Sequence, residues 1–171
     1  MSYNKRHDIG HMLVTKVGLA SFAITAASTA SDNIEQNGLL IDRSPAGTDL
    51  NDILTSAKVV VPYSMTIGTT NNTFTVSANV QHSATTASTA FTDFSQLGTT
   101  VAVSSVIETR TTAANPTSGI LEINYDLSGA ARYVRVQVTG NLSDASTAAG
   151  LDTGDIAAVW IFGGSEQPPA N

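Results

Sequence analysis

The chain has no cysteine and is poor in charged and aromatic residues. The absence of cysteine excludes disulfide bonds, thiolate metal sites and a cysteine nucleophile. Only 13% of the 171 residues are charged while 42% are hydrophobic, so we expect a solvent face built largely from Thr, Ser, Asn, Gln and Ala. Such a face is typical of β-strands and of a protein that packs against other copies or another surface.

Positive charge is scarcer than negative charge. Eight Lys and Arg against 14 Asp and Glu give a formal net charge of -6, which opposes binding to a nucleic-acid backbone. No stretch reaches the roughly 18 to 20 uncharged apolar residues of a membrane-spanning helix. The length is near that of one compact domain. We therefore expect one domain with neither nucleic acid nor membrane as a partner.

The N-terminal segment superficially resembles a secretory signal peptide, because Lys5 and Arg6 precede an apolar stretch at 12–27. Lys16 interrupts that stretch, and we interpret the segment as a retained arm. Three of the eight basic residues, Lys5, Arg6 and Lys16, cluster there and are expected to lie on an acidic neighbour. The predicted domain organisation is an N-terminal arm with a possible first strand at 1–40, a β-sandwich domain at 41–163 and a C-terminal tail at 164–171.

The clearest pattern in the sequence is alternation of apolar and polar residues with period two. It runs from Thr73 to His82 and recurs at 121–127 and 134–138, so each segment is predicted to be a half-buried antiparallel strand. The run Ile156 to Phe162 is almost wholly apolar, which indicates a central strand covered on both faces.

Other segments are less regular. Lys58 to Met65 is predicted as a strand that lies at a sheet edge or bends, because Pro62 lacks the N–H that a ladder needs. Val101 to Ile107 is another short β-branched run. A helix at Asp49 to Lys58 would be short, and a turn or two is the most we expect. These patterns predict an all-β fold, a single antiparallel β-sandwich of jelly-roll-like form with an extended N-terminal arm and a short C-terminal tail.

Metal-binding patterns are weak. His7, Asp8 and His11 would place two imidazoles at i and i+4 on a helix, but no third ligand pattern accompanies them. Three aspartates lie close enough in sequence to suggest calcium, Asp144, Asp152 and Asp155, yet they lack the Asp-x-Asp-x-Asp-Gly spacing. We expect neither a metal nor a cofactor.

Catalytic patterns are equally weak. His82 continues the inward face of its strand and is interpreted as a satisfied core or boundary histidine, since no G-x-S-x-G elbow supplies a nucleophile for it. Four carboxylates could in principle form a glycosidase pair: Asp93, Glu108, Glu122 and Asp126. Solvation on the polar side of one strand explains Glu122 and Asp126. The protein is therefore interpreted as non-enzymatic.

Side chains that contact a partner are the remaining candidates. Arg132 and Arg135 flank Tyr133 on one predicted strand and could stack on or pair with a partner, or make ordinary cross-strand contacts. The predicted contact set combines these three with the basic residues of the arm: Lys5, Arg6, His7, His11, Lys16, Arg132, Tyr133 and Arg135.

Two phrases within 73–162 resemble the jelly-roll cement or decoration proteins of tailed-phage capsids. One is Gln-His-Ser followed by Ser-Thr-Ala-Phe-Thr-Asp-Phe, at Gln81–Ser83 and Ser88–Phe94, and the other is Ala-Arg-Tyr-Val-Arg-Val at Ala131–Val136. The resemblance implies a virion protein on the outer capsid surface. It implies dimers or trimers that bridge neighbouring major capsid subunits, without catalysis. On this hypothesis, removal of residues 1–16 should weaken capsid binding and leave the β domain folded.

Two rival functions remain open at this point. A carbohydrate- or receptor-binding β-sandwich of a phage fibre or cell surface would stack exposed aromatic residues on sugars, and its candidates are Tyr63, Tyr125, Tyr133 and Trp160. A small hydrolase is disfavoured by the lack of any specific motif. A head-to-tail or fibre component would differ from a decoration protein mainly in copy number.

Overall fold

The computed structural model describes residues 13–26, 31–44, 54–66, 73–95, 104–109, 116–143 and 152–165. These residues are almost entirely β-strand, with one 3-10 turn, η3 (Ser88–Ala90), and among them no helix is long and apolar enough to cross a membrane. The strands are β1 (Val14–Thr25), β2 (Ile34–Asn37), β3 (Ile41–Asp42), β4 (Leu54–Thr66), β5 (Thr73–Ser83), β6 (Thr92–Asp93), β7 (Ser104–Thr109), β8 (Thr117–Asp126), β9 (Tyr133–Ser143) and β10 (Thr153–Ser165). The predicted all-β class is confirmed.

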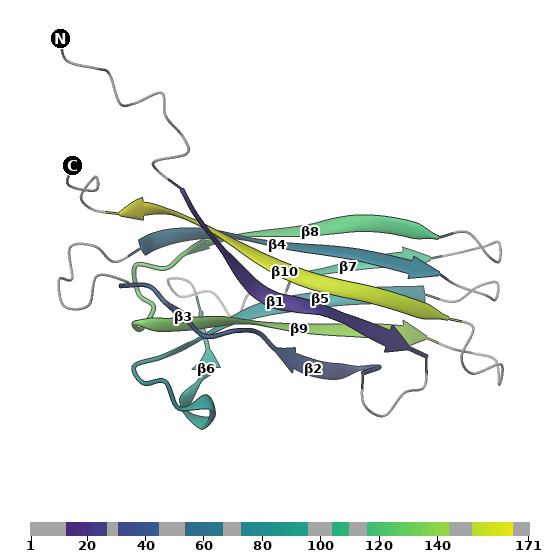
Figure 1. Cartoon of the computed structure of the whole chain (residues 1–171), viewed down its shortest axis with the longest axis horizontal. Helices are drawn as coiled ribbons and strands as arrows, with labels where there is room; N and C mark the ends of the chain where they lie inside the picture. The colour runs from purple at the N-terminus through teal and green to yellow at the C-terminus, as the bar shows by residue number, and fades with distance from the viewer. Residues whose placement is uncertain are drawn as a thin grey trace, which may run out of the picture.

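The strands form two antiparallel sheets packed face to face (Figure 1). Sheet A has the order β1-β10-β4-β8, and sheet B has the order β2-β9-β5-β6, with β3 also on β9 and β7 also on β5. The pairing is nested if β2 and β3 are counted as one strand and the two-residue β6 is left out. β1 then pairs with β10, β2 and β3 pair with β9, β4 pairs with β8, and β5 pairs with β7. This nested pairing is the topology of a jelly roll.

The core lies between the sheets and follows the predicted alternation. The inward residues of β4, β5, β8, β9 and β10 are buried, while their sequence neighbours on the strands point outward. Trp160 is fully buried and stacks on Phe162 with ring centroids 5.0 Å apart. The period-two predictions for 73–82, 121–127 and 134–138 are therefore confirmed.

The sheet-edge position predicted as one alternative for β4 is wrong. Pro62 lies in an interior strand, since β4 is flanked by β10 and β8. The β4–β10 ladder keeps one register throughout but has no pair at Val61 and Pro62, which fits the missing proline N–H. The candidate helix at Asp49 to Lys58 is also wrong where it is described, because Leu54 to Lys58 belong to β4; residues 49–53 lie outside the described residues.

The segment predicted as an arm contributes to both sheets. β1 forms the edge of sheet A on β10, and β2 forms the edge of sheet B on β9. Residues 14–25 and 34–37 thus belong to the sandwich, whereas the predicted boundary placed the β domain at 41–163. The predicted tail begins within β10, whose last residue is Ser165. Residues 1–12 and 166–171 lie outside the described residues.

Candidate functional site

The outer face of sheet A carries a continuous group of apolar side chains. We call the group the sheet A patch, and it consists of Val17, Val60, Pro62, Ile120, Val159 and Ile161. The strand register places Val17, Val159 and Val60 in one row across β1, β10 and β4. Pro62 and Ile120 form a neighbouring pair across β4 and β8.

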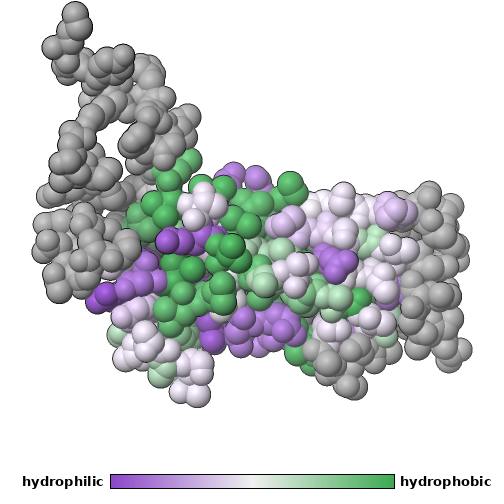
Figure 2. Space-filling model, in the orientation of Figure 1, coloured by the Kyte–Doolittle hydropathy of each residue, from purple (hydrophilic) through white to green (hydrophobic). Residues whose placement is uncertain are grey.

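The sheet A patch is open to solvent in the isolated chain. The side chains of Val17 and Ile120 are 56% and 60% exposed, and Val159 and Ile161 are half-buried. Figure 2 shows part of this side of the molecule, with hydrophobic surface in green between hydrophilic areas in purple. Exposed apolar area of this kind marks interaction surfaces more often than scattered single residues do.

The C-terminal strand explains why the patch exists. The sequence predicted that Ile156 to Phe162 would be central and covered on both faces, and β10 is indeed an interior strand. Its inward residues Ile156, Ala158, Trp160 and Phe162 are buried, but Ala157, Val159 and Ile161 are only half-buried. Among the described residues, no second layer covers this face of β10.

One ion pair lies on the same face. Lys58 on β4 donates to Glu122 on β8 at 3.1 Å, with side chains 38% and 54% exposed. An exposed pair of this kind contributes about 0–1 kcal/mol to stability. The six residues of the sheet A patch carry no charge themselves, and the exposed carboxylates of Asp126 and Asp155 lie on the same face of β8 and β10.

The outer face of sheet B is polar. Asn79 and Gln81 on β5 both donate to Oδ1 of Asp93 at 2.9 Å, and Arg135 Nε donates to Gln81 Oε1 at 2.8 Å. Across β9, Gln137 Nε2 donates to Glu35 Oε2 at 3.2 Å. Asn79, Gln81 and Gln137 belong to the polar side of the alternating strands, yet each is only 9% exposed because these groups cover one another.

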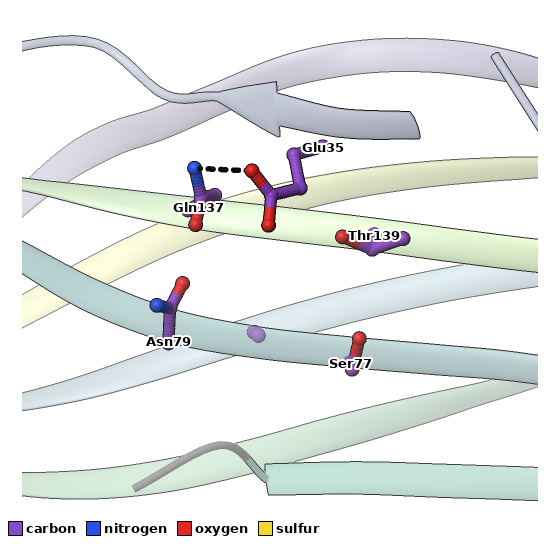
Figure 3. A pocket seen from close by; sticks show the side chains of 6 residues that line it. Glu35, Ser77, Asn79, Gln137 and Thr139 are labelled. Atoms are coloured by element: carbon purple, nitrogen blue, oxygen red, sulfur yellow. Dashed lines mark hydrogen bonds between the residues drawn. The ribbon is translucent and has the colours of Figure 1, made fainter. Parts of the chain in front are cut away.

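A shallow pocket of about 80 Å³ lies within this network (Figure 3). The register explains its lining, since Glu35, Thr139 and Ser77 form one cross-strand row, and Gln137 and Asn79 belong to the next row. No pattern in the sequence indicates this pocket, because its residues lie on three strands separated by up to about a hundred positions.

Three predicted contact residues meet at the start of β9. Arg132 makes two hydrogen bonds to Asp42, Nε–Oδ1 at 3.0 Å and Nη2–Oδ2 at 2.7 Å, and lies 5.3 Å from the centroid of the Tyr133 ring. These bonds lower the pKa of the Asp42 carboxyl. Arg135 lies over the ring of Phe91 at 4.5 Å. Both arginines thus have partners within the chain, and contact with another protein stays a prediction.

The basic residues expected in an arm are placed differently where they are described. Lys16 lies in β1, paired in register with Trp160, and its side chain is exposed. Lys5, Arg6, His7 and His11 lie outside the described residues. A deletion of residues 1–16 would remove part of β1, so a test of the arm has to stop at residue 12.

The residues considered for catalysis have structural roles in the described part of the chain. His82 accepts a hydrogen bond from the Ala131 N–H at Nδ1, 3.0 Å away, and packs on Phe94 with centroids 5.2 Å apart. This is the satisfied boundary histidine that the sequence indicated. Burial, with a smaller effect of the Arg43 charge, lowers its pKa.

The predicted carboxylates do not assemble into a site in the described part of the chain. Glu122 pairs with Lys58, Asp93 accepts from two amides, and Asp126 accepts from the backbone N–H of Ser128. Among described side chains there is no group of three His, Asp or Glu that could hold a metal ion. Asp152 is buried while Asp155 is exposed, and Asp144 and the Glu108 side chain lie outside the described residues.

Three of the four aromatic residues named for sugar stacking are in the core. Tyr63, Tyr125 and Trp160 are at most 4% exposed, and burial raises the pKa of Tyr125 to about 12. Tyr133 alone of the four is partly exposed, and Arg132 lies against it. The stacking arrangement expected of a carbohydrate-binding module is therefore missing for these residues.

Comparison with known proteins supports the fold. The sequence matches no protein-family model and no curated protein. Among solved structures, the chain is similar to infectious bursal disease virus of the Gx strain (TM-score 0.51, 9% identity, 91% of this chain and 33% of that chain). It is also similar to the T13 viral particle of that virus (0.51, 7%, 92% and 32%) and to its VP2 subviral particle (0.52, 6%, 92% and 33%).

These identities establish a shared fold and nothing finer. The chain spans about a third of the length of each of these viral chains. The jelly-roll-like sandwich predicted from the sequence is thus the fold of proteins that form virus particles.

Proposed function

We propose that this chain is a non-enzymatic structural protein of a virion, and that it binds the outer surface of a phage capsid and cements neighbouring major capsid subunits. The fold supports the general part of this proposal, because the similar solved structures are of virus particles. The resemblance of Ser88–Phe94 and Ala131–Val136 to decoration proteins supports the specific part.

The observation that carries the proposal is the sheet A patch. A jelly roll that acted alone in solution would gain nothing from apolar side chains at Val17 and Ile120, which are more than half exposed. Burying them against another subunit would remove apolar area from water at about 25 cal/mol per Å². Many copies, each adding a modest interface on a closed shell, would raise the cost of separating its subunits.

We further propose that the chain is a homo-oligomer, a dimer or trimer, on that surface. The resemblance of Ser88–Phe94 and Ala131–Val136 to decoration proteins supports this proposal, because it implies dimers or trimers. Basic residues, Lys16 among them, would supply the attraction to an acidic neighbour.

Binding to capsids tests the proposal directly. Heads of the phage that encodes the chain, prepared without the protein, would be incubated with the purified chain and recovered by sedimentation. Quantitative mass spectrometry would then give its copy number relative to the major shell protein. We expect wild type to bind at a simple fraction of the shell copy number. A handful of copies, or none, would contradict a decoration role.

Matched variants distinguish binding through the sheet A patch from non-specific adsorption to capsids. The double variant Val17→Lys, Ile120→Lys places charge on the patch and should reduce bound copies at least tenfold. Ile34→Lys, which alters an isoleucine 41% exposed on sheet B, serves as the control and should bind as wild type does. Fluorescence of Trp160 checks that each variant is folded. Full binding by the folded double variant would rule out the patch as the docking surface.

A further inference from the structure

We propose that the pocket on the outer face of sheet B binds a primary ammonium group, such as the end of a lysine side chain or of a free alkyl amine. This inference goes beyond the proposed function, because the pocket lies on the other sheet from the sheet A patch. It rests on which atoms the hydrogen-bond network leaves facing the pocket.

The network fixes the orientation of the amide groups on β5. Asp93 is a carboxylate that only accepts hydrogen bonds when ionised, so the groups that point at its Oδ1 must be the NH₂ groups of Asn79 and Gln81, both at 2.9 Å. Arg135 donates to the other end of Gln81 at 2.8 Å, which confirms that this end is the carbonyl. The Asn79 carbonyl oxygen is therefore on the side away from Asp93.

Hydrogen bonds to β2 likewise fix the orientation of the Gln137 amide on β9. The NH₂ group of Gln137 donates to Oε2 of Glu35 and to Oδ1 of Asn37, both at 3.2 Å. Both of its hydrogens are engaged, and its carbonyl oxygen receives only a long contact of 3.5 Å from Gln81. Figure 3 shows the oxygen atoms of Asn79 and Gln137 turned toward the space between β9 and β5, with the carboxylate of Glu35 lying over β9.

The lining of the pocket is therefore rich in acceptors and poor in donors. Two amide carbonyls and one carboxylate face it, with the hydroxyls of Ser77 and Thr139 beside them. The NH₂ group of Gln137 donates to Glu35 and Asn37, and that of Asn79 donates to Asp93. A ligand that donates hydrogen bonds and carries positive charge suits such a lining.

The charges around the pocket favour the same ligand. Glu35 and Asp93 supply two negative charges, and Arg135 on the far side of Gln81 supplies one positive charge. An ammonium group has three N–H donors, which matches the two carbonyls and the carboxylate. An anion would find side-chain donors in the hydroxyls of Ser77 and Thr139, but it would lie against a carboxylate and two carbonyls.

The size of the pocket and its number of oxygen ligands disfavour a drug-sized ligand and calcium. The pocket of about 80 Å³ holds two or three waters at about 30 Å³ each, and is well below the roughly 300 Å³ of pockets that enclose a drug-sized ligand. Calcium prefers about 6–8 oxygen ligands with several carboxylates, whereas this lining has one carboxylate, which already accepts from Gln137.

The test is an NMR titration of the full ¹⁵N-labelled chain. The probes are Nα-acetyl-lysine methylamide, its Nε-acetylated form, spermidine and calcium chloride. We expect the lysine compound to shift the side-chain NH₂ signals of Asn79 and Gln137 and the backbone amides of 77–79 and 137–139, with a dissociation constant of about 1–10 mM, as befits a few hydrogen bonds to one small group. The Nε-acetylated form, which has no charge, should leave these signals unmoved.

Two variants tie the shifts to the pocket. Glu35→Gln removes the carboxylate with little change in shape and should weaken binding of the lysine compound at least tenfold. Asp155→Asn makes the same carboxylate-to-amide change at an exposed position of β10 in sheet A and should bind as wild type does.

The outcomes distinguish a protein lysine from a free amine as the natural ligand. Saturable shifts from the lysine compound support a protein lysine as the natural ligand, and shifts from spermidine alone support a free amine; either upholds the ammonium site. Shifts from calcium without either amine, no shifts at all, or undiminished binding by Glu35→Gln would overturn the proposal.

Discussion

The side chain of Arg43 provides the sharpest test of how this sandwich is held together. It is 1% exposed, yet among its described contacts are backbone carbonyls rather than a carboxylate. Its Nε donates to the Leu54 oxygen at 3.0 Å, and its Nη1 donates to the oxygens of Ala130 and Ala131. One guanidinium thus joins the end of β3, the start of β4 and the turn before β9, and burial lowers its pKa.

The substitution Arg43→Met keeps the bulk and removes the donors. Each of three carbonyls left without a partner costs about 1–3 kcal/mol. The variant no longer buries a charge, which offsets several kcal/mol of this cost. We therefore expect a net loss of about 2–4 kcal/mol in the free energy of unfolding. At about 2–4 °C per kcal/mol for a domain of this size, the melting temperature should fall by roughly 4–16 °C.

A neighbouring arginine supplies the control. Arg132 makes two hydrogen bonds to Asp42, but the pair is partly exposed, with side chains 40% and 31% accessible. Arg132→Met should therefore lower the free energy of unfolding much less than Arg43→Met does. Urea unfolding followed by the fluorescence of Trp160, the only tryptophan in the chain, measures both. Equal effects of the two substitutions would refute the reasoning that burial and carbonyl satisfaction make Arg43 important.

Two further substitutions probe the chemistry of the interior. Burial lowers the pKa of His82 below its ordinary 6.5, so the stability contributed by its neutral ring is complete above pH 6.5 and is lost as the pH falls through the folded-state pKa. His82→Asn, which keeps an acceptor for the Ala131 N–H, should flatten that decline in urea unfolding curves; an unchanged slope would assign it to other groups. A Cβ on Gly38 would lie 2.3 Å from the carbonyl oxygen of Gly18, a backbone atom that has little room to move. Gly38→Ala should cost about 1–3 kcal/mol and Gly129→Ala, with nothing within 4 Å, should show no such clash; similar melting temperatures for the two would contradict the steric account.

The sequence predicted the strands whose two faces differ in polarity. Alternation identified the strands at 73–82, 121–127 and 134–138 because period two is a local property of the chain. β1 was harder to recognise for a physical reason. Its pairing with β10 shifts between Val17 and Leu19 and again between Leu19 and Phe22, and each shift breaks the alternation that identifies a strand.

The candidate surfaces could be predicted only in part. The apolar run of β10 indicated a strand covered on both faces, and its outward residues belong to the sheet A patch. The sheet B pocket depends on the register of β2 on β9 and of β9 on β5, and register between distant segments is not readable from composition. Arg43 was missed because a single arginine in sequence is expected at the surface.

The two outer faces of the sandwich differ in a way that constrains where partners can bind. On sheet B the outward amides satisfy one another and leave side chains only 9% exposed, so another surface would have to displace bonds already made. On sheet A the outward residues Ala157, Val159 and Ile161 of β10 have no polar side-chain atoms to satisfy and remain half-buried, so covering these three side chains costs no hydrogen bond. A broad protein contact is therefore favoured on sheet A, whereas sheet B suits a small donor that adds to its network without breaking it.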